Sequence, residues 1–482
     1  MKRIILIAVF ALVFSGASLA QKMARVTPES EGISSTAIIN FLDGIKAGKN
    51  EFHSFVLLRH GNIVAEGWWN PYALQMRHTL YSTSKSFTST AVGFAVSEGK
   101  LKLSDKVVSF FPQDLPLKIS PLLAQLTVQN LITMSAGQRP EPHLDENSKD
   151  TWVKQFLAAP IVDTPGTKFL YNSIATYMLS AIVQKVSGQK VLDYLQPRLF
   201  TPLGISGADW EESPQGINTG GWGLRLKTED MAKFGQMLLQ KGKWQGKTVV
   251  PQNWVEEATT FKIKNWADTA QASRKTSDWA QGYCYQFWRC RYNAFRADGA
   301  FGQYIVVMPD QDAVIAITCE TGNMQNELNL VWEHLLPAMK SAPLPGNKTT
   351  YAQLQARLKA LEIAMPEKTT AKGAEAMISG KSFKVDTNQH KISEVKFTFN
   401  GDQCRYDIDI AGQHFGFTAG RNARVAGETS FPFSPPSLTA SKFGRPKDAQ
   451  AQKTSASFRW VSPTSMEIYV RYPESAHSET FI

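Results

Sequence analysis

Hydrophobic and polar positions follow strand spacing near the start of the chain, helical spacing through its middle, and strand spacing again later. The stretch "FVLLRH-GN-IVAEGWW" predicts two strands joined by a tight Gly-Asn turn. The segments "LTVQNLITMSAG", "SIATYMLSAIVQKVSG" and "TEDMAKFGQMLLQKG" repeat apolar residues at helical spacing and end in glycine. Strand spacing returns in "GYCYQFWRCRY", interpreted as one continuous strand, and in "GQYIVVM-PDQD-AVIAIT", which predicts a hairpin. The amphipathic "NELNLVWEHLLPAMK" then predicts a closing helix.

Strands at both ends of this region, with helices between them, predict an α/β (α+β) fold. Distant segments would complete one antiparallel sheet, flanked by helices and joined to an α-rich subdomain. Residues 343–350 have linker composition, and the segments "ISEVKFTFNGDQCRYDIDIAGQHFGFTAG", "SFRWVSPTSMEIYVRY" and "SETFI" beyond one short helix predict a small β domain. The expected domains are therefore 21–342 and 351–482.

The first twenty residues have the pattern of a cleaved secretory signal. Lys2 and Arg3 precede the apolar run "IILIAVFALVF", and small residues precede Gln21. The run is too short to span a bilayer comfortably, and no later stretch approaches twenty apolar residues. We expect a signal peptide at 1–20 and an exported, periplasmic protein without stable membrane insertion.

Composition and charge narrow the class of protein. The chain has 482 residues, of which 43% are hydrophobic and 20% charged, an ordinary globular composition. Its formal charge of +10 is spread along the chain, and no Lys/Arg cluster interleaved with aromatics predicts nucleic-acid binding. Of the four cysteines, Cys284 and Cys290 would lie about 20 Å apart on one strand. A Cys290–Cys319 disulfide stays open, and buried free thiols are the favoured interpretation.

The motif Ser-x-x-Lys occurs four times, although about two occurrences are expected by chance. A serine attacks only when a base removes its proton, and a lysine can do so only where burial or positive neighbours lower its pKa. Helical neighbours three residues apart share a face. Two pairs straddle a glycine at a helix end and one falls in a strand, where an odd separation points the side chains to opposite faces. These are Ser97/Lys100, Ser187/Lys190 and Ser393/Lys396.

Only Ser82 and Lys85 lie within one continuous helical pattern. They share a polar face with Ser86 and Ser89, opposite the apolar face of the helix. Ser82 also stands at the N-terminal end, where free N–H groups and the helix dipole favour developing negative charge. The competing interpretation is an ordinary N-capping serine beside a solvated lysine.

These residues resemble a known family, the serine β-lactamase and penicillin-binding-protein superfamily, and most closely class C β-lactamases and related esterases. The resemblance covers residues of about 25 to 340 and rests on "STSK", "YNS" and "ADG". It implies a β-lactamase/transpeptidase-like fold and convergence of three elements at one site. Tyr171 would share a proton with Ser82 and Lys85, and Ser173 stands where asparagine is usual.

The third element, at the end of a strand, implies Asp298, Gly299 and Ala300 as substrate-binding residues. By the resemblance, the backbone N–H groups of Ser82 and Ala300 form the oxyanion hole. Ala297 stands where the family has the lysine or histidine that meets a substrate carboxylate. Arg296 is a possible substitute, although strand neighbours should face opposite ways.

Together these features predict a serine hydrolase that works through an acyl-enzyme on a small ester, amide or peptide. One alternative is a β-lactamase or D-alanyl-D-alanine carboxypeptidase, and another is a penicillin-receptor-like sensor with little turnover. No histidine pair at metal-ligand spacing, phosphate loop or G-x-S-x-G motif occurs, so neither a metal nor another cofactor is expected. The sequence does not predict an oligomeric state.

Overall fold

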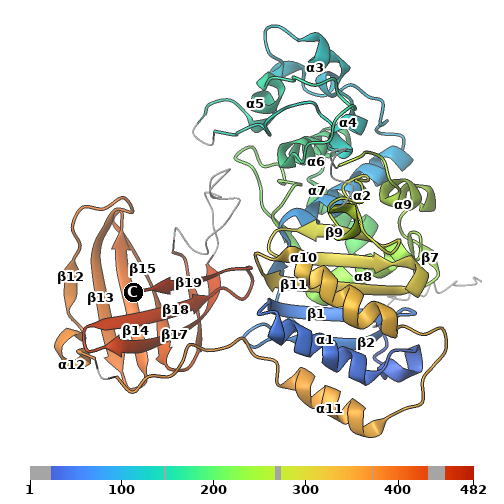
Figure 1. Ribbon diagram of the computed structural model, residues 1–482. Helices are drawn as coiled ribbons and strands as arrows, with labels where there is room; N and C mark the ends of the chain where they lie inside the picture. The colour runs from blue at the N-terminus through green and yellow to red at the C-terminus, as the bar shows by residue number, and fades with distance from the viewer. Residues whose placement is uncertain (1–22, 146–147, 266–272, 372, 432–450) are drawn as a thin grey trace, which may run out of the picture.

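The computed structural model describes residues 23–145, 148–265, 273–371, 373–431 and 451–482. An N-terminal domain of helices and strands stands beside a smaller β domain formed by the C-terminal part of the chain (Figure 1). The expected signal, 1–20, lies outside the described residues. Among the helices that are described, none has the length and apolar character needed to cross a bilayer.

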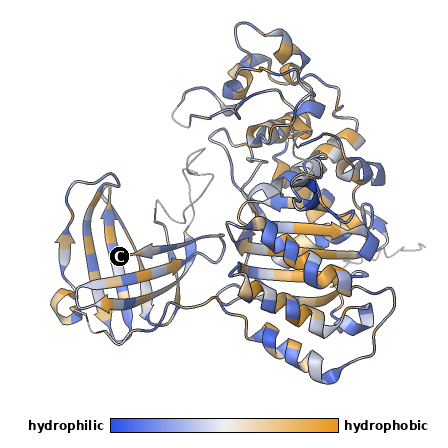
Figure 2. Cartoon of the chain, viewed as in Figure 1, coloured by the Kyte–Doolittle hydropathy of each residue, from blue (hydrophilic) through white to orange (hydrophobic). Residues whose placement is uncertain are grey.

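A six-stranded antiparallel sheet forms the centre of the N-terminal domain. Strands from the two ends of the domain's sequence complete it, as the hydrophobic pattern predicts. The spatial order is β2 (Asn62–Trp68), β1 (Glu51–Arg59), β11 (Ala313–Glu320), β10 (Gln303–Met308), β9 (Phe295–Gly299) and β8 (Trp288–Arg289). The central strands are buried almost throughout because helices cover both faces, and Figure 2 shows their hydrophobic character.

Each face of the sheet packs on its own set of helices. One set comprises α1 (Ser35–Ala47), α10 (Met324–Leu330), the π-helical turn η9 (Val331–Leu335) and α11 (Lys348–Lys359). The other comprises α8 (Thr228–Leu239) and α2 (Ser84–Ser97). The helix α1 shows the reason for this placement, since Ile38, Phe41, Leu42 and Ile45 recur on one face and are buried against the sheet.

A helical subdomain lies beyond α2, on the side away from the sheet (Figure 1). Its helices are α3 (Pro121–Gln125), α4 (Val128–Ile132), α5 (Trp152–Ala158), α6 (Ser173–Ser187), α7 (Val191–Leu195) and α9 (Gln252–Thr259). Short strands join the parts: β3 (His78–Thr79), β5 (Leu224–Leu226) and β4 (Asp209–Trp210) form one sheet, and β6 (Lys243–Trp244) pairs with β7 (Lys247–Thr248). The helix α2 is thus enclosed between the sheet and the helical subdomain.

The C-terminal β domain has its own hydrophobic core. Its curled sheet runs β12 (Ser382–Lys384), β13 (Ile392–Asn400), β14 (Gln403–Ile410), β15 (Gln413–Arg421), β17 (Gln452–Ser462), β18 (Ser465–Arg471) and β19 (Ser478–Phe481), with β16 (Val425–Thr429) paired to β17 and the short helix α12 (Glu375–Ile378) alongside. In β14 the side chains of Cys404, Tyr406, Ile408 and Ile410 alternate into the core, which is the predicted period-two pattern.

Two segments differ from what their patterns predict. The stretch around Cys284 is not one strand, because the N–H of Cys284 bonds to the carbonyl of Phe287 at 2.9 Å and Gln286 takes a left-handed φ of 65°. The helix α11, grouped by sequence with the C-terminal domain, packs on α1 and buries Leu354 in the core of the N-terminal domain. All four cysteines are buried and free, which confirms the favoured interpretation.

Gly235 sets how closely α8 can approach the sheet. A methyl group added there would lie 2.6 Å from Cγ1 of Val314 and 2.7 Å from Cγ2 of Ile305. Alanine favours the helix by about 1 kcal/mol, but these β-branched neighbours on central strands cannot turn away. We expect Gly235→Ala to lower the free energy of unfolding by about 1–2 kcal/mol in guanidinium titrations. Gly346→Ala, where nothing lies within 4 Å, should change it by less than about 0.5 kcal/mol. A Gly235→Ala protein as stable as the parent would contradict this packing.

Candidate active site

Ser82 lies in a 3-10 turn, η2 (Tyr81–Thr83), directly before α2. Its side chain is partly exposed, whereas α2 is buried on every side from Ser84 to Ala95. The interpretation of a polar face on this helix is therefore wrong. The hydroxyl of Ser86 donates to the carbonyl of Gln286 at 2.8 Å, and Thr83, the N-cap residue of α2, makes no capping hydrogen bond with its side chain. The turn thus presents the Ser82 hydroxyl at the edge of an otherwise enclosed helix.

Lys85 is 1% exposed, so it is not the solvated lysine of the competing interpretation. Its Nζ donates to Ser82 Oγ at 3.1 Å, to Ser173 Oγ at 3.1 Å and to the carbonyl of Gly221 at 2.6 Å. A lysine head group makes at most three such bonds. Because the three acceptors come from separate segments, the amine is fixed in position beside Ser82.

Tyr171 and Ser173 reach the same point from the start of α6. The amine of Lys85 lies 4.9 Å from the centre of the Tyr171 ring. Between them, Asn172 caps α6 by accepting the N–H of Ala175 at 2.8 Å, so its side chain turns away from Lys85. Burial raises the pKa of the Tyr171 phenol above its ordinary value, and a hydrogen bond with Ser82 only partly offsets this effect. The phenol therefore keeps its proton at neutral pH.

Gly221 is the part of the site that sequence reasoning missed. A methyl group on Gly221 would lie 2.7 Å from the carbonyl oxygen of Ser173, and one on Gly220 would lie 2.7 Å from Cβ of Ser180. Only a pair of glycines fits so close to α6 while turning a carbonyl toward Lys85. The signal in the sequence was "NTGGWG", a cluster of glycines that lies between the short strands β4 and β5.

The end of β9 brings the predicted third element to the η2 turn. A methyl group on Gly299 would lie 2.2 Å from the carbonyl oxygen of Leu80, so this glycine admits the chain's own turn. Asp298 forms an ion pair with Arg296 at 2.8 Å and its side chain is 9% exposed. Burial raises the pKa of Asp298, while Arg296 and Lys85 act in the opposite direction. Ala300, partly exposed, follows directly where the strand ends.

Neither Ala297 nor Arg296 offers a cation to a substrate. Ala297 is 1% exposed and opposes Ile305 in the core on the α2 side of the sheet. Arg296 is fully buried on the other side, where it donates to the carbonyl of Asp278 at 2.8 Å and lies 4.5 Å from the Trp279 ring. The substitution of Arg296 for the family's lysine is therefore not supported by its position.

Aromatic side chains surround Tyr171. Its ring stacks on Trp288 at 5.6 Å, Trp288 meets Tyr283 edge-on at 4.9 Å, and Phe169 lies 5.1 Å from Tyr283. Phe169 and Trp288 are partly exposed. This cluster gives the approach to Tyr171 an apolar and aromatic wall, which a neutral group contacts at lower desolvation cost than a charged one.

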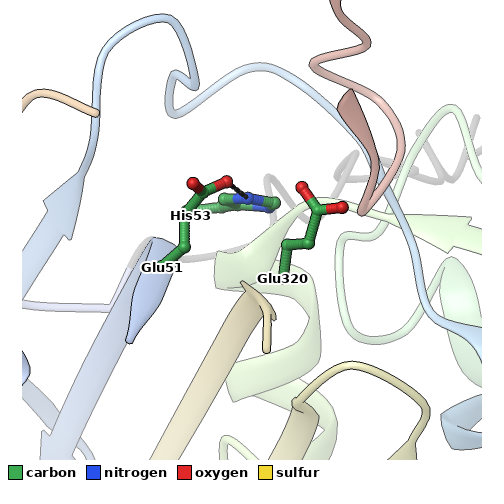
Figure 3. A group of neighbouring side chains, drawn as sticks. All are labelled: Glu51, His53 and Glu320. Carbon is green, nitrogen blue, oxygen red and sulfur yellow. Dashed lines mark hydrogen bonds and ion pairs between the residues drawn. The ribbon is translucent and has the colours of Figure 1, made fainter. Parts of the chain in front are cut away.

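One group of side chains could hold a metal ion by distance alone. Potential ligand atoms of Glu51, His53 and Glu320 lie within 4.8 Å of one another, and Figure 3 shows both carboxylates beside the imidazole ring. Arg471 already pairs with both oxygens of Glu51, and Ser478 donates to Glu320 at 3.3 Å. A cation would compete with the Arg471 guanidinium, so we interpret the group as an ion-pair network between the two domains.

Comparison with known proteins identifies the family of the chain. The family model described as Beta-lactamase matches residues 53–335, more than half of the chain. The 6-aminohexanoate-dimer hydrolase of Paenarthrobacter ureafaciens is 27% identical over 284 residues, which cover 54% of this chain and 71% of that protein. The β-lactamase of Escherichia coli (strain K12) is 26% identical over 195 residues, or 35% of this chain and 50% of that protein.

Solved structures share the fold. A candidate 6-aminohexanoate-dimer hydrolase from Bacillus anthracis superposes with a TM-score of 0.51 at 20% identity, covering 70% of this chain and 88% of its own. The hydrolase EstCE1 superposes with a TM-score of 0.50 at 14% identity, covering 62% and 99% of the two chains. The predicted fold class is confirmed, and the chain belongs to the β-lactamase family of serine hydrolases.

Proposed function

We propose that the protein is an exported serine hydrolase that acylates Ser82 and then hydrolyses the acyl-enzyme, with an uncharged ester or amide as substrate. The observation that carries this proposal is the position of Lys85. A buried amine that touches the Ser82 hydroxyl, and is fixed by Ser173 and Gly221, has the geometry of a base next to its nucleophile.

The proton path follows from the contacts of Lys85 and Tyr171. A neutral amine donates to Ser173 and Gly221 and accepts the Ser82 proton across the remaining 3.1 Å contact. Ser82 Oγ bonds to the substrate carbonyl carbon as that proton moves to Nζ. When the tetrahedral intermediate collapses, the bond from that carbon to the leaving oxygen or nitrogen breaks. Tyr171, whose pKa is raised by burial, gives its proton to this leaving atom and regains one from Lys85. Water then attacks the acyl-enzyme by the reverse path.

The negative oxygen of the tetrahedral intermediate needs donors that are already in place. We assign this role to the backbone N–H groups of Ser82 and Ala300, because Gly299 abuts the carbonyl of Leu80 and so brings the end of β9 to the η2 turn. Such a donor contributes about 3 kcal/mol to the transition state. Asp298 and Ser173 would contact the rest of the substrate beside them.

The neutral surroundings favour an uncharged substrate. Ala297 and Arg296 are both buried, and the wall beside Tyr171 is aromatic. Two similar proteins are hydrolases by name, a 6-aminohexanoate-dimer hydrolase and a β-lactamase, which supports hydrolysis as the reaction. Hydrolysis of β-lactams or D-alanyl-D-alanine peptides, and slow acylation without turnover in a sensor, are the alternatives that the tests below separate. Export to the periplasm is proposed from the pattern of residues 1–20.

Ser82 is expected to be the single acylation site. Intact-protein mass spectrometry after treatment with a fluorophosphonate should show one adduct, which Ser82→Ala abolishes. Ser97→Ala is the matched control because Ser97 also precedes a lysine by three residues, yet its hydroxyl donates to the carbonyl of Phe94. An adduct that persists in Ser82→Ala would refute the assignment. With an activated ester as substrate, a burst of product without later turnover would favour the sensor.

Lys85 and Tyr171 are expected to act as one proton-transfer unit. Each of Lys85→Ala and Tyr171→Phe should lower kcat/KM by about 10²–10⁴-fold, and the double variant should fall within about threefold of the worse single variant. Tyr177→Phe, on the same helix with its hydroxyl 3.2 Å from Ser213, supplies the additive control. Fully multiplicative losses for Lys85 and Tyr171 would show that they act separately.

Neutral esters should be better substrates than carboxylate-bearing β-lactams. A charged contact to a carboxylate is worth about 2 kcal/mol, so its absence at Ala297 should lower kcat/KM by roughly 30-fold for a chromogenic cephalosporin relative to a short-chain nitrophenyl ester. Both are measured on one preparation. A higher kcat/KM for the cephalosporin would mean that another residue supplies the cation. Ala297→Lys is not a usable converse test, because the side chain points into the core.

A further inference from the structure

The loop between β18 and β19 is buried although loops usually lie at the surface. Every residue from Tyr472 to His477 is buried, and the covering residues belong in part to the N-terminal domain. The carbonyl of Glu474 accepts the N–H of Thr79 at 3.0 Å, three residues before Ser82. In Figure 1 the hairpin of β18 and β19 reaches across to the larger domain. A segment of the C-terminal domain therefore lies against the strand that leads to the nucleophile.

Ion pairs hold this hairpin at the edge of the central sheet. Glu51 and Glu320 are register partners at the ends of β1 and β11. Arg471 pairs with Glu51, and Ser478 donates to Glu320 at 3.3 Å. Burial raises the pKa of Glu51, but hydrogen bonds from His53 and Arg471 outweigh it and lower the pKa to about 2. Glu51 is consequently charged at any working pH, and the hairpin stays anchored.

In the anchored hairpin, His477 contacts Tyr81 and Phe301, the residues next to the two proposed oxyanion donors. Its Nδ1 lies 3.3 Å from Glu320 and its Nε2 lies 2.5 Å from the hydroxyl of Tyr81. In the neutral tautomer that donates from Nδ1 to the carboxylate, Nε2 accepts this hydroxyl. The ring also meets Phe301 edge-on at 4.7 Å, and Tyr81 and Phe301 lie 5.5 Å apart. One side chain from the C-terminal domain thus closes a three-ring cluster.

Tyr81 and Phe301 both have a left-handed backbone conformation, which the surrounding side chains must hold in place. Tyr81 directly precedes Ser82 and has a φ of 46°, and Phe301 directly follows Ala300 and has a φ of 63°. Bulky residues rarely occupy this left-handed region and remain there only where their surroundings hold them. The Ser82 N–H belongs to the peptide group that directly follows Tyr81, whereas the Ala300 N–H belongs to the Gly299–Ala300 peptide, one peptide before the bond that joins Ala300 to Phe301. Contacts that fix Tyr81 therefore fix the Ser82 N–H directly, and contacts that fix Phe301 restrain Ala300, and with it the second proposed donor, from the following residue.

We propose that His477 is a positioning residue supplied by the C-terminal β domain, which completes the oxyanion hole by holding Tyr81 and Phe301. This inference rests on the proposed role of the Ser82 and Ala300 N–H groups. It gives the β domain a part in catalysis, since the N-terminal domain alone lacks the side chain that joins the two left-handed residues.

His477→Ala should lower kcat for a nitrophenyl ester by about 10–100-fold with KM within about threefold, because outright loss of one oxyanion donor costs about 10²–10³-fold. Affinity for a phenylboronic acid, whose adduct with Ser82 has a tetrahedral boron and an oxygen in the oxyanion position, should fall by a similar factor. His477→Gln keeps an acceptor for Tyr81 and should recover most of kcat. His414→Ala, an exposed histidine of the same domain that bonds to Asp409, is the control and should change nothing.

The outcomes separate this inference from the proposed function. If a folded His477→Ala protein keeps its kcat and boronate affinity, or shows only a higher KM, the positioning role of His477 is overturned. Loss of activity in Ser82→Ala would still support Ser82 as the nucleophile in that case. Activity that survives in Ser82→Ala would overturn the proposed function itself. If His477→Ala does not fold, Tyr81→Phe keeps the ring packing and removes the hydroxyl that His477 accepts. Its kcat and boronate affinity must then fall together.

Discussion

The site depends on the three hydrogen bonds that Lys85 makes inside the protein. Its acceptors belong to the η2 turn, to the start of α6 and to the Gly220–Gly221 turn, and they lie up to 136 residues from Lys85 in the chain. Burying a lysine is costly unless its N–H groups find partners, so these three segments cannot shift independently. The same requirement that stabilises the buried amine also places it against Ser82, and Tyr171 arrives with Ser173 on α6.

The local patterns predicted the fold class and much of the site. The hairpins β1–β2 and β10–β11 and the helices α6 and α8 follow directly from hydrophobic spacing. The pair Ser82/Lys85 stands out because only it lies within one continuous helical pattern of the sequence. The polar-face argument failed because α2 is enclosed on every side, so the Ser86 hydroxyl, for example, donates to a backbone carbonyl instead of to solvent. The Gly221 carbonyl and His477 escaped notice because a single sequence carries no record of which distant segments pack together.

Both domains contribute contacts to the proposed active site. The C-terminal β domain has its own core, yet its β18–β19 hairpin is anchored through Glu51 and Glu320 at the ends of central strands. The β18–β19 hairpin therefore contacts the same sheet whose strand β9 ends at the proposed oxyanion hole. Contacts from both domains surround Tyr81 and Phe301, which explains how two unfavourable backbone conformations persist beside the proposed nucleophile.

The central claim is that the Oγ atom of Ser82 carries the acyl group during turnover. The most direct measurement quenches steady-state ester hydrolysis in acid, digests the protein and locates the acyl group by tandem mass spectrometry. The account predicts the mass of the acyl group on Ser82, in the peptide that also contains Lys85, and its disappearance once substrate is exhausted. An acyl group on another residue, or turnover with no trapped acyl-enzyme under conditions where deacylation is rate-limiting, would contradict it.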